Sequence, residues 1–154
     1  MTTVAVHWPW FAADSQLTSG VMIQRVAKLF RLPDGGVASG AGDWAKAYRA
    51  LKWLEAGEHG DCPEFEGASL IIGRPDGTVW QADDEWPAYP IVGQIAALGC
   101  GAQPAMVALC GGQTPAQAVA SVAAHDAGTS GPIQAMQVCK VVVTYQPLGK
   151  AKRK

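Results

Sequence analysis

The chain has 154 residues, which is the size of one domain with a single hydrophobic core. Its 12 Lys and Arg residues against 13 Asp and Glu residues give a formal charge of −1, which argues against binding to nucleic acid or to an anionic membrane surface. Hydrophobic residues make up 49% and charged residues 16%, a composition that excludes a disordered chain. No apolar run reaches the roughly 18 residues of a membrane span and no signal-peptide pattern opens the chain, so we expect a cytoplasmic location.

The first half of the chain predicts pairs of strands and one helix. Short apolar runs on both sides of turn residues predict three hairpins. Their paired runs are residues 3–6 with 10–13, 26–32 with 37–38, and 69–72 with 78–81. Apolar residues recur with helical spacing from Trp44 to Leu54, which predicts a helix with Asp43 as its N-cap. Residues 14–20 and 83–90 show no regular pattern.

The second half predicts a strand, two helices and closing strands. The strand covers residues 95–98, and the helices cover 104–110 and 115–125, the second with Thr114 as its N-cap. Strand material follows from 133 to 145. This order of elements predicts an α+β fold of stacked sheets covered by helices. We expect a single domain over residues 1–148 and a basic, disordered tail over 149–154.

The first residues of the chain offer a candidate nucleophile. Small residues follow Met1, so removal of Met1 would leave Thr2 at the N-terminus. An α-amine has a pKa of about 7.7 to 8.0, so the amine of Thr2 could take the proton of its own hydroxyl near neutral pH. The same opening begins many ordinary proteins, so by itself this signal is weak.

Several further segments, in chain order, strengthen this interpretation. Together they resemble the proteasome β-subunit and HslV-like family of N-terminal nucleophile (Ntn) hydrolases. The segments are Thr2 to Val6, Ala13-Asp14 with Thr18 and Gly20, Lys28, Ala38 to Asp43, Ser69 to Ile72, Leu98 to Gly101, and Asp126 with Thr129 to Gly131. The resemblance implies a four-layer αββα sandwich, the Ntn-hydrolase fold.

The resemblance also implies catalytic roles. Thr2 would be the nucleophile, with its α-amine as general base and later as general acid. Lys28 would lower the pKa of that amine and stabilise the alkoxide, while Asp14 would hold Lys28 in place. Gly40 would donate its backbone N–H to the oxyanion of the tetrahedral intermediate.

Further residues are implied by the same resemblance. Cys100 stands where the family has a serine beside the N-terminal amine, and Asp126 and Thr129 form a third supporting segment. The implied specificity pocket is lined by Val26, Ala38 and Gly42, small or apolar residues that favour hydrophobic substrate side chains. No cofactor is required, and a structural monovalent or divalent cation would bind the backbone carbonyls of Ala123, Asp126 and Thr129.

The resulting hypothesis is a threonine-type peptidase, active once Met1 is removed. The resemblance implies a homo-oligomeric ring, alone or stacked, with peptides or unfolded proteins as substrates and an ATP-dependent unfoldase as a partner. Two alternatives stay open. One is a catalytically inactive, ring-forming structural homologue that keeps Met1, which Cys100 and the short chain favour; the other is a small-molecule amidase on the same fold.

Overall fold

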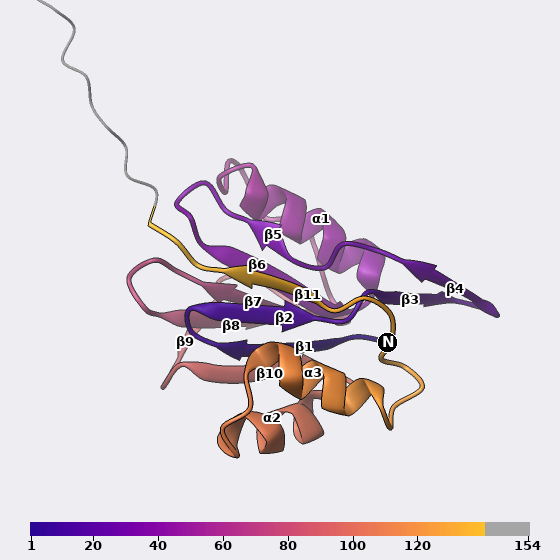
Figure 1. Cartoon of the computed structure of the whole chain (residues 1–154). Coiled ribbons are helices and arrows are strands. Elements are labelled where there is room, and N and C mark those ends of the chain that lie inside the picture. Colours follow the sequence, from indigo (N-terminus) through magenta and orange to yellow (C-terminus); the bar gives the residue numbers. More distant parts are fainter. Residues whose placement is uncertain (141–154) are drawn as a thin grey trace, which may run out of the picture.

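Two antiparallel sheets form the body of the chain, for which a computed structural model describes residues 1–140 (Figure 1). The first sheet has four strands in the order β10-β1-β2-β11, and the second has five in the order β5-β6-β7-β8-β9. The strands of the first sheet are β1 (Thr3–His7), β2 (Trp10–Ala13), β10 (Ile95–Gly99) and β11 (Gln134–Gln137). Those of the second are β5 (Phe30–Arg31), β6 (Val37–Gly42), β7 (Ala68–Gly73), β8 (Val79–Asp83) and β9 (Tyr89–Ile91).

Helices lie on both sides of the strands. In Figure 1, α1 (Trp44–Glu55) lies on one side, and α2 (Ala102–Cys110) and α3 (Pro115–Ala123) lie on the other. The side chain of Asp43 accepts a hydrogen bond from the Lys46 amide and so caps α1, as the sequence predicts. A capping box between Thr114 and Gln117 begins α3.

Three apolar clusters hold these elements together. Because side chains alternate along a strand, Val4 and Val6 of β1 point toward the second sheet, while Ala5 points toward α2 and α3. The cluster between the sheets includes Phe11, Val37 and Ile71. The cluster under α1 includes Leu51, Leu54, Leu70 and Ile72, and the one under α2 and α3 includes Leu109 and Val119. The predicted α+β class is therefore confirmed.

The three predicted hairpins and all three predicted helices are present, with ends shifted by a few residues. Three strands are not predicted by the sequence. Residues 16–25 form a further hairpin of β3 (Gln16–Ser19) and β4 (Met22–Arg25), which projects from the body in Figure 1, and β9 lies in the segment expected to be irregular. Gly20, with a φ of 58°, closes the turn between β3 and β4, and it is the signal that could have revealed this hairpin.

Two predicted strands are too long. Residues 26–29, which include Lys28, are not a strand. The side chain of Gln134 replaces a partner strand there, because it accepts from the Lys28 amide at 2.9 Å and donates to the Val26 carbonyl at 2.7 Å. The closing strand is β11 alone among the described residues, and the remainder of that prediction, together with the tail, lies outside them. Within residues 1–140, no helix has the length and apolar character needed to cross a membrane.

Candidate active site

A lysine, a threonine and an aspartate meet at one end of the two sheets. The Lys28 Nζ atom lies 3.0 Å from the Thr2 Oγ1 atom and 2.8 Å from the Asp14 Oδ1 atom. It also donates to the carbonyl of Met1 at 3.3 Å. The side chains of Lys28 and Asp14 are fully buried, and Thr2 is 6% exposed. A charged group is thus held against a threonine hydroxyl in an environment that excludes water.

The pairing of β1 with β2 brings Asp14 to the start of the chain. Val4 lies opposite Ala13, so Asp14 comes directly after the end of β2 and beside Thr3. The Asp14 carboxylate accepts from the amides of Thr3 at 2.9 Å and Gln16 at 3.0 Å. With the bond from Lys28, the buried carboxylate therefore has three hydrogen-bond donors, so neither of its oxygens is left without a partner.

Lys28 is held through its backbone as well as its side chain. Its amide donates to Gln134, and its carbonyl accepts from the Ser39 hydroxyl of β6 at 2.7 Å. The lysine is therefore tied to both sheets. Burial lowers the pKa of the Lys28 ammonium, and the hydrogen bond and charge of Asp14 offset part of that shift. A buried lysine with a lowered pKa and a specific charged partner is typical of functional sites.

A second network of hydrogen-bonded side chains lies beside Lys28, Thr2 and Asp14. The Thr3 and Thr129 hydroxyls are 2.6 Å apart, and the Thr129 hydroxyl donates to Asp126 at 2.6 Å. The bonds from Thr129 and from the Gly128 amide lower the pKa of the Asp126 carboxyl. The Cys100 sulfur lies 3.3 Å from the Asp126 carboxylate and 3.4 Å from the Thr2 carbonyl, so it connects this second network to Thr2.

Thr2 opens into a cavity of about 410 Å³. The residues that line it are Met1, Thr2, Ala41, Gly42, Ser69, Gly99 and Cys100; we call this cavity the Thr2 pocket. A Cβ atom on Gly99 would lie 1.8 Å from the Thr2 carbonyl oxygen, so only glycine permits β10 to approach so closely. Most of the lining is small, which leaves room for a ligand side chain next to the Thr2 hydroxyl.

The structure brings together most of the residues singled out in the sequence, but not all of them. Thr2, Asp14 and Lys28 are in direct contact, Cys100 and Gly42 line the Thr2 pocket, and Asp126 and Thr129 contact Cys100. The other three predicted residues, Gly40, Val26 and Ala38, are not among those that line the pocket.

The geometry of β6 explains where two of these three residues lie. Ala38 and Gly40 are on the face of β6 that is turned toward α1, since Ala38 belongs to the cluster under α1 and a Cβ atom on Gly40 would meet Ala47 at 3.2 Å. Gly42 lies at the end of the strand with a φ of 93°, where the alternation stops, and it reaches the pocket. Val26 contacts Gln134 through its carbonyl instead.

Sequence reasoning assigned no role to several residues of the site. Thr3, Ser39 and Gln134 hold Asp14, Lys28 and Thr129 in place, and Ala41, Ser69 and Gly99 line the pocket. Ser69 and Gly99 belong to segments that carry the family resemblance, which could have marked them. Nothing local marks Gln134, because its partners are more than 100 positions away along the chain.

The predicted cation site stays a prediction. The carbonyl of Asp126 accepts from the Thr129 amide at 3.1 Å, so it is already engaged in a turn. Among residues 1–140, no group of three or more His, Cys, Asp or Glu side chains is arranged to hold a metal ion. That finding concerns side chains, whereas the prediction concerns the backbone carbonyls of Ala123, Asp126 and Thr129.

Comparison with known proteins identifies the fold. No protein-family model matches the sequence, and no curated protein matches it at a significant level. Solved structures do match. BPH of Thiobacillus denitrificans in complex with epoxomicin has a TM-score of 0.63 at 15% identity, with 89% of this chain and 99% of that chain covered. HslV of Trypanosoma brucei has a TM-score of 0.64 at 19% identity, with 88% and 99% covered.

These matches extend over nearly the whole of both chains. A second structure of T. denitrificans BPH gives a TM-score of 0.62 at 14% identity, with 90% of this chain and 99% of that chain covered. At such low identity the likeness concerns the fold. The resemblance to HslV-like proteins is thus confirmed at the level of the fold, and the activity has to be argued from the site.

Proposed function

We propose that this protein is an N-terminal threonine peptidase that cleaves peptide bonds with Thr2 once Met1 has been removed. The contact between the Thr2 hydroxyl and the buried Lys28 ammonium, at 3.0 Å, carries the proposal. The fold shared with HslV, and with a protein solved in complex with epoxomicin, supports it.

The placement of Lys28 favours a catalytic role over a purely structural one. A buried ion pair adds little to stability on balance, since the cost of removing both charges from water offsets their attraction. Lys28 also points its ammonium at a hydroxyl and not only at its carboxylate partner. A cation in that position stabilises the negative charge that develops on the hydroxyl oxygen during attack.

The proposed reaction begins once Met1 is removed. The free α-amine of Thr2 takes the proton of the Thr2 hydroxyl, and the oxygen attacks the substrate carbonyl carbon to form a tetrahedral intermediate. The protonated amine passes its proton to the leaving nitrogen, which leaves an ester on Thr2. Water, activated by the same amine, then hydrolyses the ester. A backbone N–H at the end of β6 would stabilise the oxyanion, with Gly40 as the predicted donor and with Gly42 at the wall of the Thr2 pocket.

We extend the proposal to the architecture and the assembly. The two sheets with α1 on one side and α2 and α3 on the other would form the four-layer αββα sandwich, in a cytoplasmic homo-oligomeric ring. The tip of the β3–β4 hairpin supports assembly, since Val21, Met22 and Ile23 are 100%, 61% and 58% exposed and form an apolar projection. Peptides or unfolded proteins would be the substrates, delivered by an ATP-dependent unfoldase.

The intact mass of the purified protein, before and after treatment with epoxomicin, tests the proposal. We expect the loss of one methionine and then a covalent adduct of one inhibitor per chain. Thr2→Ala removes the adduct, since the nucleophile is gone. The matched control is Thr18→Ala, which removes an exposed threonine hydroxyl outside the Thr2 pocket and keeps the adduct.

One observation favours the inactive homologue as a second candidate. Met1 fits the structure, since its carbonyl accepts from Lys28 and its side chain packs on Gly128, where a Cβ atom would lie 2.5 Å from the Met1 methyl carbon. Retained Met1 with no adduct would contradict the peptidase and favour the scaffold. An adduct combined with cleavage of simple amides but not of peptides would favour the amidase.

A further inference from the structure

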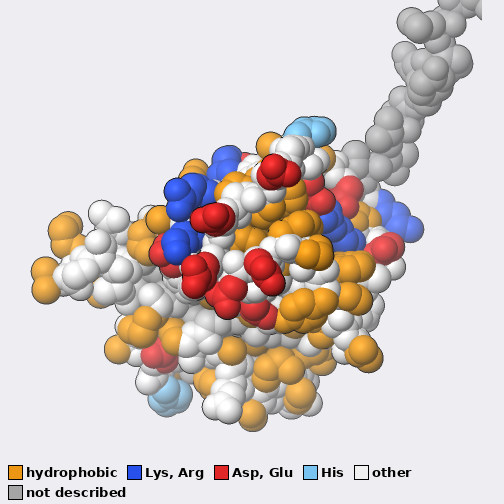
Figure 2. Space-filling model, turned by 180° about the vertical axis from the view of Figure 1, so that it is seen from behind, with side chains coloured by type: hydrophobic (Ala, Val, Ile, Leu, Met, Phe, Trp, Pro, Cys, Tyr) orange, Lys and Arg blue, Asp and Glu red, His pale blue; other side chains and the backbone are white. Residues whose placement is uncertain are grey.

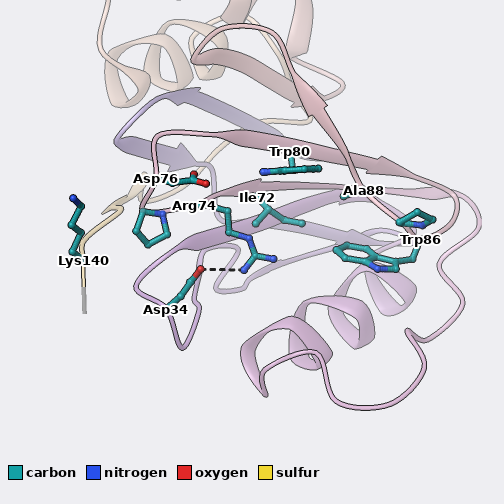
Figure 3. A pocket seen from close by; sticks show the side chains of 10 residues that line it. Asp34, Ile72, Arg74, Asp76, Trp80, Trp86, Ala88 and Lys140 are labelled. Atoms are coloured by element: carbon teal, nitrogen blue, oxygen red, sulfur yellow. Dashed lines mark hydrogen bonds and ion pairs between the residues drawn. The ribbon is translucent and has the colours of Figure 1, made fainter. Parts of the chain in front are cut away.

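The cavity at the outer surface of the five-stranded sheet is larger than the Thr2 pocket. It has a volume of about 880 Å³, against about 410 Å³ at Thr2. Ile72 of β7 and Trp80 of β8 form its floor on the side of the sheet that carries α1, and Trp86 closes one end (Figure 3). The cavity thus combines apolar and aromatic side chains with Asp34, Arg74, Asp76 and Lys140, and it shares no lining residue with the Thr2 pocket.

The described part of the chain ends at this cavity. After β11 the Cys139 amide donates to the carbonyl of Gly35 at 3.0 Å, which fixes the chain beside the β5–β6 turn. Lys140, the last described residue, lines the cavity at the end opposite Trp86 (Figure 3). The chain that continues from Lys140 therefore starts at the mouth of the cavity.

An acidic cavity of about 640 Å³ adjoins the first one, because Trp86 lines both. Its charged lining residues are all acidic: Glu64, Glu66, Asp84 and Glu85. None of these four carboxylates has an ion-pair partner within residues 1–140. Figure 2 shows a face of the molecule on which acidic side chains gather around exposed apolar ones. We call the two adjoining cavities the outer groove.

The remaining 14 residues are complementary to the outer groove in their apolar and charged content. Val141 to Tyr145 reads Val-Val-Val-Thr-Tyr, and it is followed by four basic residues at positions 150, 152, 153 and 154. These are four of the 12 basic residues, and none of the 13 acidic ones lies there, so the last five residues carry +4 and the rest of the chain −5. Asp34, Arg74 and Asp76 lie toward the Lys140 end of the groove, and Ile72, Trp80 and Trp86 give it an apolar stretch before the acidic cavity (Figure 3).

We propose that residues 141–154 bind in the outer groove of their own molecule. Val141 to Tyr145 pack against Trp80 and Trp86, and the basic end pairs with the carboxylates of the acidic cavity. The segment is long enough to extend along the groove, since five extended residues span roughly 17 Å and 14 extended residues span about 46 Å. The segment is tethered at the mouth of the groove, so its effective concentration there is about millimolar, which favours it over a second copy.

The charges already inside the groove do not oppose this arrangement. The Arg74 guanidinium is engaged by Asp34 at 3.3 Å and by Glu58, so it is not a free cation facing the basic end of the segment. Trp80 donates its indole N–H to the Thr78 hydroxyl at 2.8 Å, which leaves its ring face for apolar contact. The polar groups beside the apolar half of the groove are thus already satisfied.

Limited trypsin digestion of the native full-length chain tests the proposal, because trypsin cleaves after Lys150, Lys152 and Arg153. The reference rate comes from a synthetic peptide of residues 139–154. We expect the tail of the intact protein to be cleaved at least about tenfold more slowly than the peptide, as a bound segment resists proteolysis. Raising the salt concentration should increase the cleavage rate of the tail, since salt screens the attraction between the basic end and the exposed carboxylates.

Two variants release the segment from opposite sides. Trp86→Ala removes a wall of the groove, and Val142→Asp changes only the segment, so it keeps the test valid if Trp86→Ala unfolds the body. Both are expected to bring the cleavage rate to that of the peptide. Trp10→Ala, which removes an indole that is 46% exposed on β2 outside the groove, leaves the protection unchanged.

Three outcomes would overturn the proposal. Cleavage of the native tail at the rate of the peptide would show that the segment is not bound. Protection that survives both Trp86→Ala and Val142→Asp would place the segment elsewhere. Protection that falls as the protein is diluted would show that a second copy, and not the same molecule, supplies the segment.

Discussion

One ion pair lies beside Thr2 and another lies in the outer groove, and the first is buried whereas the second is partly exposed. Lys28 and Asp14 at the Thr2 pocket have side chains that are both 0% exposed. Arg74 and Asp34 at the outer groove are 25% and 42% exposed. The first pair has lost its water and depends on protein partners, whereas the second keeps much of its hydration.

This difference shows where the fold holds its groups rigidly. Asp14 has three hydrogen-bond donors, and Lys28 is held by both sheets, so neither side chain can move without leaving a buried charge unpaired. Such a fixed arrangement suits a reaction that needs an ammonium beside a hydroxyl. The outer groove instead offers exposed carboxylates and aromatic faces, which suits the reversible binding of a segment.

The largest expected difference between the two regions is in the free energy of unfolding that is lost when one carboxylate in each region is replaced by an amide. Asp14→Asn leaves Lys28 buried without a counter-charge and should lower the free energy of unfolding by about 3 to 5 kcal/mol. Asp34→Asn keeps its bond to the Gly36 amide and should cost about 0 to 1 kcal/mol. Urea denaturation of both variants measures this, and equal losses would contradict the comparison.

Two glycines, one in each region, test how closely their backbone lies to neighbouring atoms. Gly99 at the Thr2 pocket and Gly77 near the outer groove have φ angles of 91° and 93°, so alanine strains both backbones equally. A Cβ atom at Gly99 meets the Thr2 carbonyl at 1.8 Å, whereas at Gly77 the nearest atom is a flexible Gln94 nitrogen at 3.6 Å.

We therefore expect Gly99→Ala to cost at least about 2 kcal/mol more than Gly77→Ala in thermal or urea unfolding, because the clash adds to a strain of roughly 1 to 2 kcal/mol common to both. Gly99→Ala should also abolish the epoxomicin adduct, since it displaces Thr2. A similar cost for the two variants would mean that β10 does not press against Thr2.

Gln134 tests whether Lys28 is held through its backbone. Gln134→Ala removes the bonds to the Lys28 amide and the Val26 carbonyl, and we expect a loss of about 1 to 3 kcal/mol together with slower formation of the epoxomicin adduct. The matched control is Gln137→Ala, an exposed glutamine on the same strand. A variant that keeps the wild-type rate of adduct formation would show that Lys28 does not need this support.

The smallest expected effect is on the pH dependence of stability, through the thiol of Cys62 at the outer groove. Burial raises the pKa of the Cys62 thiol to about 11 from 9.0, with a smaller effect of Glu58. The unfolded chain therefore releases this proton first, so the contribution of Cys62 to stability is complete below pH 9 and is lost as the pH rises through about 11.

Two measurements check this effect. The fall in stability between pH 9 and 11 should be less steep in Cys62→Ala than in the wild type. At pH 9 the thiolate fraction of Cys62 is roughly 1%, so iodoacetamide should label it more slowly than the exposed Cys110, as followed by peptide mass spectrometry. Labelling of Cys62 as fast as Cys110 would contradict the shift.

The sequence predicts the main elements because their signals are local. Turn residues mark the β1–β2, β5–β6 and β7–β8 hairpins, and helical spacing with a cap marks α1 and α3. The β3–β4 hairpin was missed because its strands are polar or exposed and carry no apolar alternation. The segment at Lys28 was assigned to a strand because apolar residues surround it, while a side chain, Gln134, takes the place of the missing partner.

The sequence by itself determined the α+β class and, through a resemblance spread over the chain, the candidate residues Thr2, Asp14 and Lys28. Only the tertiary structure decided their contacts, because Thr2 and Lys28 meet through the packing of two sheets and not through their spacing along the chain. It also decided which part of β6 reaches the Thr2 pocket, since Ala41 and Gly42 line the pocket whereas Ala38 packs toward α1. Composition and periodicity describe single elements, whereas a site is made where elements distant in sequence are packed together.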